Sequence, residues 1–174
     1  MPYIGELSSL KYLRFNFIKF LSTDFAYLDK LENLEELDTE LGSHGIDLAR
    51  SKVLPHLLSL SISNCSTISP VIEKLTHSNK LRTLSFSGVT LSAYDCKNIC
   101  AIENLEKLHL GRLQLTNQNL KQLANATTLK ELDVCQISTI TTKGLDDLVK
   151  MKGLRKLALP DKVLTVRSCI VVSL

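Results

Sequence analysis

The chain repeats one leucine pattern at an almost constant interval, and this repeat restricts its fold more than any other feature. The pattern Leu-x-x-Leu-x-apolar begins seven times, at residues 10, 34, 57, 81, 105, 129 and 154. Successive starts are 24, 23, 24, 24, 24 and 25 residues apart. Such a period is typical of repeat architectures, in which each unit buries its apolar row only against its neighbours. The sequence therefore predicts seven stacked units rather than a domain with scattered leucines.

Each unit has two kinds of apolar position, which predict a strand followed by a helix. Counted from the first leucine, positions 4 and 6 alternate with polar residues, as in a half-buried strand. Apolar residues return at position 9 and again at positions 16 and 19, and this last spacing of three is helical. In the fifth unit Thr116 or Asn117 is expected to cap the helix. Strands are predicted to begin near residues 12, 36, 59, 83, 107, 131 and 156.

Stacking these units predicts a single α/β domain over residues 1–174. Parallel strands are expected on the concave face of a right-handed superhelix, with helices on its convex face. Thr39 interrupts the third apolar position of the second unit, and the loop at 41–45 is rich in glycine. We therefore expect the second unit to be the least well specified. Residues 1–10 resemble the tail of a preceding unit, and 163–166 and 170–172 are apolar without a cap signature, so the chain is expected to be part of a longer array.

The fifth and sixth units follow a longer consensus that extends past the strand. The fifth reads Leu-Glu-Lys-Leu-His-Leu at 105–110, Leu-Thr at 115–116 and Leu-Lys-Gln-Leu at 120–123. The sixth continues with Ile-Thr at 140–141 and Gly-Leu-Asp-Asp-Leu at 144–148. This order resembles the leucine-rich repeat family, and within it the cysteine-containing subtype, whose position-9 cysteine is present here as Cys65. The resemblance implies a horseshoe-like solenoid that binds proteins as a scaffold, adaptor or substrate receptor, or as a pathogen effector.

Composition narrows the class of partner. The 21 basic and 18 acidic residues are spread along the chain and give a formal net charge of +3, so nucleic acid is not expected. No apolar stretch approaches the roughly 18 residues of a membrane helix, and no signal-peptide layout opens the chain. We expect no membrane partner and a cytoplasmic location, with a secreted effector as the alternative. The five scattered cysteines are typical of reduced thiols. No cofactor is expected, and the oligomeric state is left open.

Positions 3, 5 and 7 of each unit are predicted to line the concave face, because alternate strand residues face opposite sides. They form an acidic strand, two strands with only hydroxyl side chains, and a region of mixed charge. The hydroxyl strands are equally well explained by a tight inner curve that requires small residues. Three basic and five acidic side chains give this face a negative balance, so the expected partner is another protein with a basic patch. The residues predicted to bind it are Tyr12, Arg14, Glu36, Asp38, Glu40, Ser61, Ser85, Lys107, His109, Glu131 and Asp133.

The same rule makes further predictions for this face. It places Asn16, Ala158 and Pro160 there as well. Lateral ion pairs are expected between Arg14 and Asp38 and between Lys107 and Glu131, each contributing under about 1 kcal/mol.

Two groups of cysteines suggest chemistry other than protein binding. Cys135 shares a face with His109 and Asp133. The alternative function is therefore a cysteine-dependent enzyme that uses these three residues. An open sheet face offers no closed pocket and no evident oxyanion donors, so no enzyme activity is predicted. Cys96 and Cys100 have the spacing of a metal pair on a helix, but Cys96 falls at apolar position 16. It is expected in the core, and no metal site is predicted.

Overall fold

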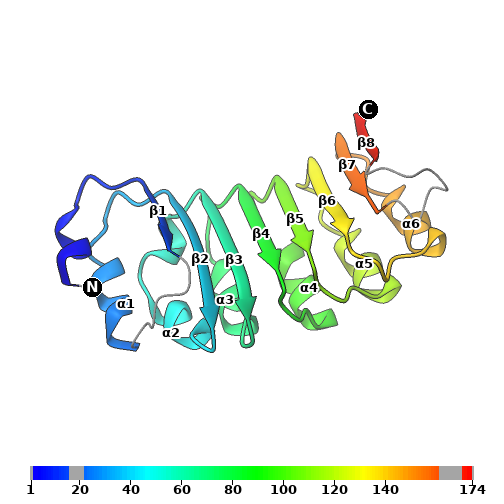
Figure 1. The fold of residues 1–174 in the computed structure, drawn as a ribbon. Helices are drawn as coiled ribbons and strands as arrows, with labels where there is room; N and C mark the ends of the chain where they lie inside the picture. The colour runs from blue at the N-terminus through cyan, green and yellow to red at the C-terminus, as the bar shows by residue number, and fades with distance from the viewer. Residues whose placement is uncertain (1, 16–21, 161–169, 174) are drawn as a thin grey trace.

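The structure, a computed structural model, describes residues 2–15, 22–160 and 170–173. Its strands form one sheet and follow each other in chain order (Figure 1). They are β1 (Tyr12–Phe15), β2 (Glu36–Gly42), β3 (Ser59–Cys65), β4 (Thr83–Ser87), β5 (Lys107–Gly111), β6 (Glu131–Gln136), β7 (Lys156–Leu159) and β8 (Ile170–Ser173). Strands β1 to β7 are parallel, and β8 runs antiparallel to β7. Each of the first seven strands begins at the predicted residue.

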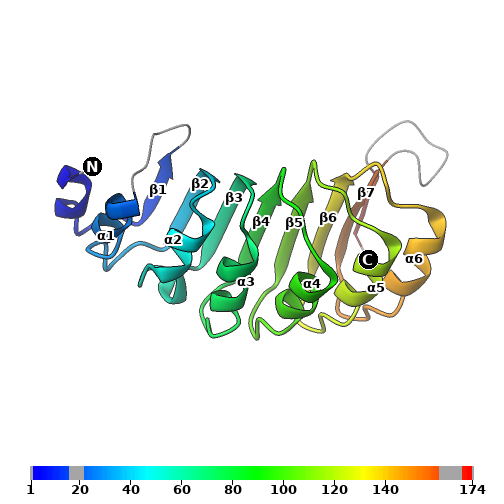
Figure 2. The ribbon, with the colours of Figure 1, turned by 90° about the horizontal axis from the view of Figure 1, so that it is seen from below.

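The helices form a second layer on one side of the sheet (Figure 2). They are α1 (Phe25–Leu28), α2 (Gly45–Arg50), α3 (Ser69–Leu75), α4 (Ala93–Cys100), α5 (Asn117–Leu123) and α6 (Thr142–Leu148), with 3-10 turns η1 (Pro2–Glu6), η2 (Ser22–Asp24) and η3 (Leu54–His56). Each α-helix connects two successive parallel strands, which confirms the α/β class. Within the described ranges, none of these helices has the length and apolar content needed to cross a membrane.

The core lies between the sheet and the helices and is built from the repeated apolar positions. Leu60, Leu84 and Leu108 occupy position 4 of three successive units, pair in register and are fully buried. Phe86, at position 6 of the fourth unit, is the largest fully buried side chain among the described residues. Cys96 is also fully buried, as its place in the repeat predicted.

Two of the short helices begin with reciprocal capping. In α4 the hydroxyl of Ser92 accepts a hydrogen bond from the Asp95 amide at 3.1 Å, and the Asp95 carboxylate accepts one from the Ser92 amide at 2.8 Å. In α5 Thr116 accepts from the Asn119 amide at 3.2 Å, and Asn119 accepts from the Thr116 amide at 3.0 Å. Thr116 is therefore the cap, one of the two predicted candidates. Such caps typically stabilise a helix by about 1 kcal/mol.

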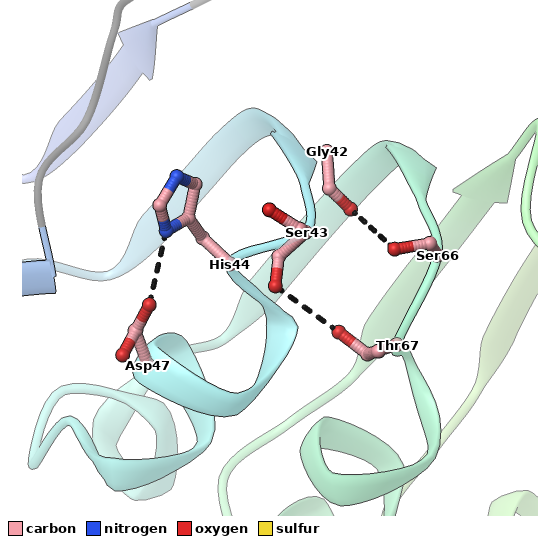
Figure 3. A network of polar contacts seen from close by, with 6 residues as sticks. All are labelled: Gly42, Ser43, His44, Asp47, Ser66 and Thr67. Carbon is pink, nitrogen blue, oxygen red and sulfur yellow. Dashed lines mark hydrogen bonds and ion pairs between the residues drawn. The ribbon is translucent and has the colours of Figure 1, made fainter.

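The loop between β2 and α2 is held by the next unit along the chain (Figure 3). The hydroxyl of Thr67 donates to the carbonyl oxygen of Ser43 at 3.3 Å, and that of Ser66 donates to the carbonyl oxygen of Gly42 at 3.2 Å. The Ser66 amide donates to the same Gly42 carbonyl at 2.8 Å. These bonds fix two successive peptide groups of the glycine-rich loop.

Two further contacts fix the start of α2. His44 Nδ1 lies 3.0 Å from Asp47 Oδ2, across the first turn (Figure 3). Gly45 is buried, and a Cβ placed on it would lie 2.0 Å from the carbonyl oxygen of Thr67. The glycine-rich loop of the second unit is therefore held by defined contacts, and the expectation that this unit is the least well specified stays a prediction. Glycine is required at position 45 because two backbones approach closely there.

Thr39 is the polar residue that interrupts the core positions of β2. Its hydroxyl is buried and has no hydrogen-bond partner among the described residues, and the residue lies in register between Phe15 and Ile62. We predict that Thr39→Val raises the free energy of unfolding by about 1 kcal/mol, because it removes an unsatisfied buried polar group. Urea unfolding measures the effect. Thr83→Val, the same change on a half-buried position, should stay within about 0.5 kcal/mol; a destabilised Thr39→Val would contradict the prediction.

The sheet continues one strand beyond the seven predicted, because β8 pairs with the outer edge of β7. Ala158 and Pro160 were predicted to line the concave face; Ala158 does lie in register with Asp133, as its repeat position predicted, but both residues are buried rather than exposed. Ala158 pairs with Asp133 on one side and with Val171 on the other, so β7 is an inner strand of the sheet. Asn16 and the segment 163–166 lie outside the described residues.

Candidate functional site

The side of the sheet opposite the helices, which we call the open face, carries all the residues predicted to bind a partner. Along β2, β3 and β4 buried residues alternate with half-buried or exposed ones. The buried set packs toward the helices, so the other set forms the open face. The predicted residues Tyr12, Arg14, Glu36, Asp38, Glu40, Ser61, Ser85, Lys107, His109, Glu131 and Asp133 are all half-buried or exposed.

The three carboxylates of β2 differ in whether they already form an ion pair or a hydrogen bond within the protein. Asp38 Oδ2 lies 3.1 Å from Arg14 Nε, which confirms the predicted lateral pair. Glu40 Oε1 accepts a hydrogen bond of 2.7 Å from the side chain of Asn64. Glu36 is exposed at the start of the strand. The acidic strand therefore keeps a negative balance, with Glu36 as its most accessible carboxylate.

On the open face, the next two strands after β2, which are β3 and β4, present only hydroxyl side chains. Their open-face residues lie in register as Ser59 with Thr83, Ser61 with Ser85 and Ser63 with Ser87, and all are half-buried. Neighbouring strands are about 4.8 Å apart, so the six hydroxyls form a dense group of donors and acceptors with little side-chain bulk. This group separates the carboxylates of β2 from the charges of β5.

The strands beyond β4 carry mixed charge. Glu131 Oε1 lies 2.6 Å from Lys156 Nζ, and this hydrogen bond is the main reason that the pKa of Lys156 is raised. Lys107 is in register with Glu131 on the other side, as expected. The carboxylate of Glu131, however, forms its ion pair with Lys156. The predicted pair with Lys107 therefore named the wrong one of its two lysine neighbours.

His109 and Asp133 lie side by side on β5 and β6, as predicted from the repeat. His109 Nδ1 is 3.7 Å from Asp133 Oδ2, and the other oxygen of this carboxylate accepts a hydrogen bond of 3.0 Å from the Cys135 amide. Just past this point the two strands change register. His109 pairs with Asp133 but Gly111 pairs with Gln136, so two steps on β5 match three on β6. The extra residue forms a β-bulge.

A cavity of about 210 Å³ lies at this bulge, and we call it the bulge cavity. It opens on the open face between β4, β5 and β6. Its polar side chains are those of Ser85, Ser87, His109, Asp133, Cys135 and Gln136. The sequence predicted that His109, Asp133 and Cys135 share one face, but it did not predict a cavity beside them. The extra residue in the sixth unit, which spans 25 residues, is the signal that could have located the bulge.

The cysteines of α4 are buried in a way that suppresses their reactivity. Burial raises the pKa of Cys96 to about 11, and burial together with the nearby Cys96 raises that of Cys100 to about 11. The thiolate is the reactive form, so both remain unreactive near neutral pH. The Cys100 thiol also lies 3.2 Å from the carbonyl oxygen of Gln122. In the described part of the chain, no group of three or more His, Cys, Asp or Glu residues is arranged to hold a metal ion.

Comparison with protein-family profiles finds no matching family, and comparison with curated proteins finds no significant match.

Proposed function

We propose that this chain is a leucine-rich repeat solenoid that binds another protein through its open face, as a scaffold, adaptor or substrate receptor in the cytoplasm. The observation that carries the proposal is a sheet face that none of the described helices covers and that presents polar side chains on five neighbouring strands. Binding, rather than catalysis, is the activity that such a surface supports best.

The repeat supports the architectural part of the proposal. Seven parallel strands begin 23 to 25 residues apart, and each pairs with the strands of the adjacent units. Units of this kind place all helices on one side, so stacking leaves the other side of the sheet available to a partner. The right-handed superhelix and the concave shape of the open face belong to this proposal.

The charges of the open face support the choice of partner. Glu36, Asp38 and Glu40 lie on one strand, and Arg14 is the basic residue paired with this group. A basic patch on the partner would complement the remaining negative charge and accelerate association. The hydroxyl groups on β3 and β4 would then hydrogen-bond to the partner without steric hindrance.

We predict that Glu36→Lys combined with Asp38→Lys slows association with the captured partner by about tenfold and reduces its salt dependence. The wild-type protein is immobilised to capture partners from a cell lysate, and association rates of a captured protein are then measured at several salt concentrations. Because both side chains lie on the surface, the free energy of unfolding should change by less than about 1 kcal/mol.

Lys121→Glu on α5 is the matched control, since it reverses one exposed charge on the helical side. It should leave the association rate unchanged. If the β2 double variant binds like the wild type and Lys121→Glu abolishes capture, the partner docks on the helical side and the proposed site is wrong.

A further inference from the structure

The bulge cavity is a hollow in the open face at the point where the strand register changes. Adjacent strands β3, β4 and β5 pair without a change of register, whereas β6 contains one extra residue. A bulge bends its strand and turns nearby side chains aside. Opposite it lies Gly111, on which a Cβ would be 3.0 Å from Gln136 Oε1 and 3.7 Å from Ser87 Oγ. The missing side chain of Gly111 therefore keeps space open between these two polar groups.

The size of the bulge cavity limits what it can hold. Small-molecule sites usually measure about 300–1,000 Å³, and one water occupies about 30 Å³ of the liquid. A cavity of about 210 Å³ is below the first range and several times the second value. It therefore fits one long side chain better than a complete metabolite.

The lining of the bulge cavity favours a cation that donates hydrogen bonds. Asp133 supplies the carboxylate of the lining, with His109 Nδ1 at 3.7 Å from it, and no lysine or arginine is among the described lining residues. The Cys135 amide holds one carboxylate oxygen at 3.0 Å, which fixes the orientation of the group. Each carboxylate oxygen can accept more than one hydrogen bond, so both retain acceptor capacity. The hydroxyls of Ser85 and Ser87 and the amide oxygen of Gln136 add further acceptors.

We propose that the bulge cavity is a subsite for one lysine or arginine side chain of the partner, with Asp133 as its counter-ion. This inference deepens the proposed function and rests on it, because the cavity opens on the proposed binding face. It adds a specific requirement to the general preference for a basic partner. A cationic side chain must project far enough to reach the strand bulge at β6.

The thiol of Cys135 allows the subsite to be tested without the partner. The probes are three small disulfides: cystamine, which is cationic, 2-hydroxyethyl disulfide, which is neutral, and dithiodiglycolic acid, which is anionic. The Cys135 thiolate attacks one sulfur of the probe, a mixed disulfide forms, and the probe's own disulfide breaks. The other half leaves as a thiolate that takes up a proton, so no further oxidant is needed. Mass spectrometry of peptides measures the modified fraction of Cys135, normalised to the same chain unfolded in urea.

We predict that cystamine modifies Cys135 about three- to fivefold more than the neutral probe, and that the anionic probe modifies it least. Asp133→Asn should remove this preference, while Asp146→Asn, at an exposed carboxylate of α6 on the helical side, should leave it intact. Gly111→Ala should reduce modification by all three probes, because the new methyl group narrows the cavity. Equal modification by the three probes, or a preference for cystamine that survives Asp133→Asn, would overturn the subsite.

The two proposals fail separately. If the Glu36 and Asp38 reversal weakens capture but Cys135 shows no preference for cystamine, the open face binds a partner without this subsite. If the cystamine preference depends on Asp133 but the reversal leaves association unchanged, the subsite is real and the acidic strand is not the anchor.

Discussion

Replacing Phe86 with alanine is expected to lower the free energy of unfolding by about 3–5 kcal/mol. Phe86 is fully buried and lies in register between Ile62 and Leu110, in the middle of the sheet. Its removal leaves a cavity whose walls belong to three neighbouring units, so no single unit can shift to fill it. Urea unfolding, monitored by circular dichroism, measures this loss of unfolding free energy.

The neighbouring Ser85→Ala variant separates this packing effect from a general effect on β4. Ser85 is half-buried on the open face, so its truncation should change stability by less than about 0.5 kcal/mol. A loss below about 1 kcal/mol in Phe86→Ala would show that the core is loosely packed at this position.

Gly45→Ala is expected to destabilise the protein by about 3 kcal/mol, although helix propensity alone predicts the opposite sign. Alanine is favoured over glycine inside a helix by up to about 1 kcal/mol. In α2, however, the new Cβ would lie 2.0 Å from the carbonyl oxygen and 2.8 Å from the carbonyl carbon of Thr67. These are backbone atoms, so a rotamer change cannot relieve the contact, and α2 must move away from its neighbour.

Gly42→Ala in the same loop is the matched control. Gly42 has a φ of +55° but nothing within 4 Å of its added Cβ. Its replacement should cost only the strain of a left-handed backbone, about 1 kcal/mol. Thermal unfolding of the two variants compares the effects directly. If Gly45→Ala is as stable as the wild type, the close approach between α2 and Thr67 does not exist in solution.

The strand positions could be predicted from the sequence because the repeat supplies many copies of one signal. The first seven strands begin at the predicted residues, and the side-by-side placement of His109 and Asp133 follows from the same count. The buried position of Cys96 was predictable for this reason too. It occupies an apolar position that other units fill with Phe25, Ile72 or Leu120.

Features that occur in one unit only were not predictable in this way. The bulge on β6 arises from one added residue, and the added strand β8, which pairs with β7, matches no repeat position. The close packing at Gly45 was not predicted, because the sequence alone does not show which backbone lies against a glycine. The ion pair of Glu131 with Lys156 rather than Lys107 depends on side-chain geometry that register alone does not define.

The chain-order arrangement of the strands has a consequence for how the protein opens. Among the residues that the structure describes, each strand pairs only with strands adjacent in the sequence, and no pairing joins one end of the sheet to the other. Local unfolding can then begin at either terminus and advance one unit at a time, with the central units opening last. A partner lying across β2 to β6 would contact five units at once, whereas within the sheet each of these strands pairs only with its immediate neighbours. Its binding would make them open together, so the bound protein would unfold more cooperatively than the unbound one.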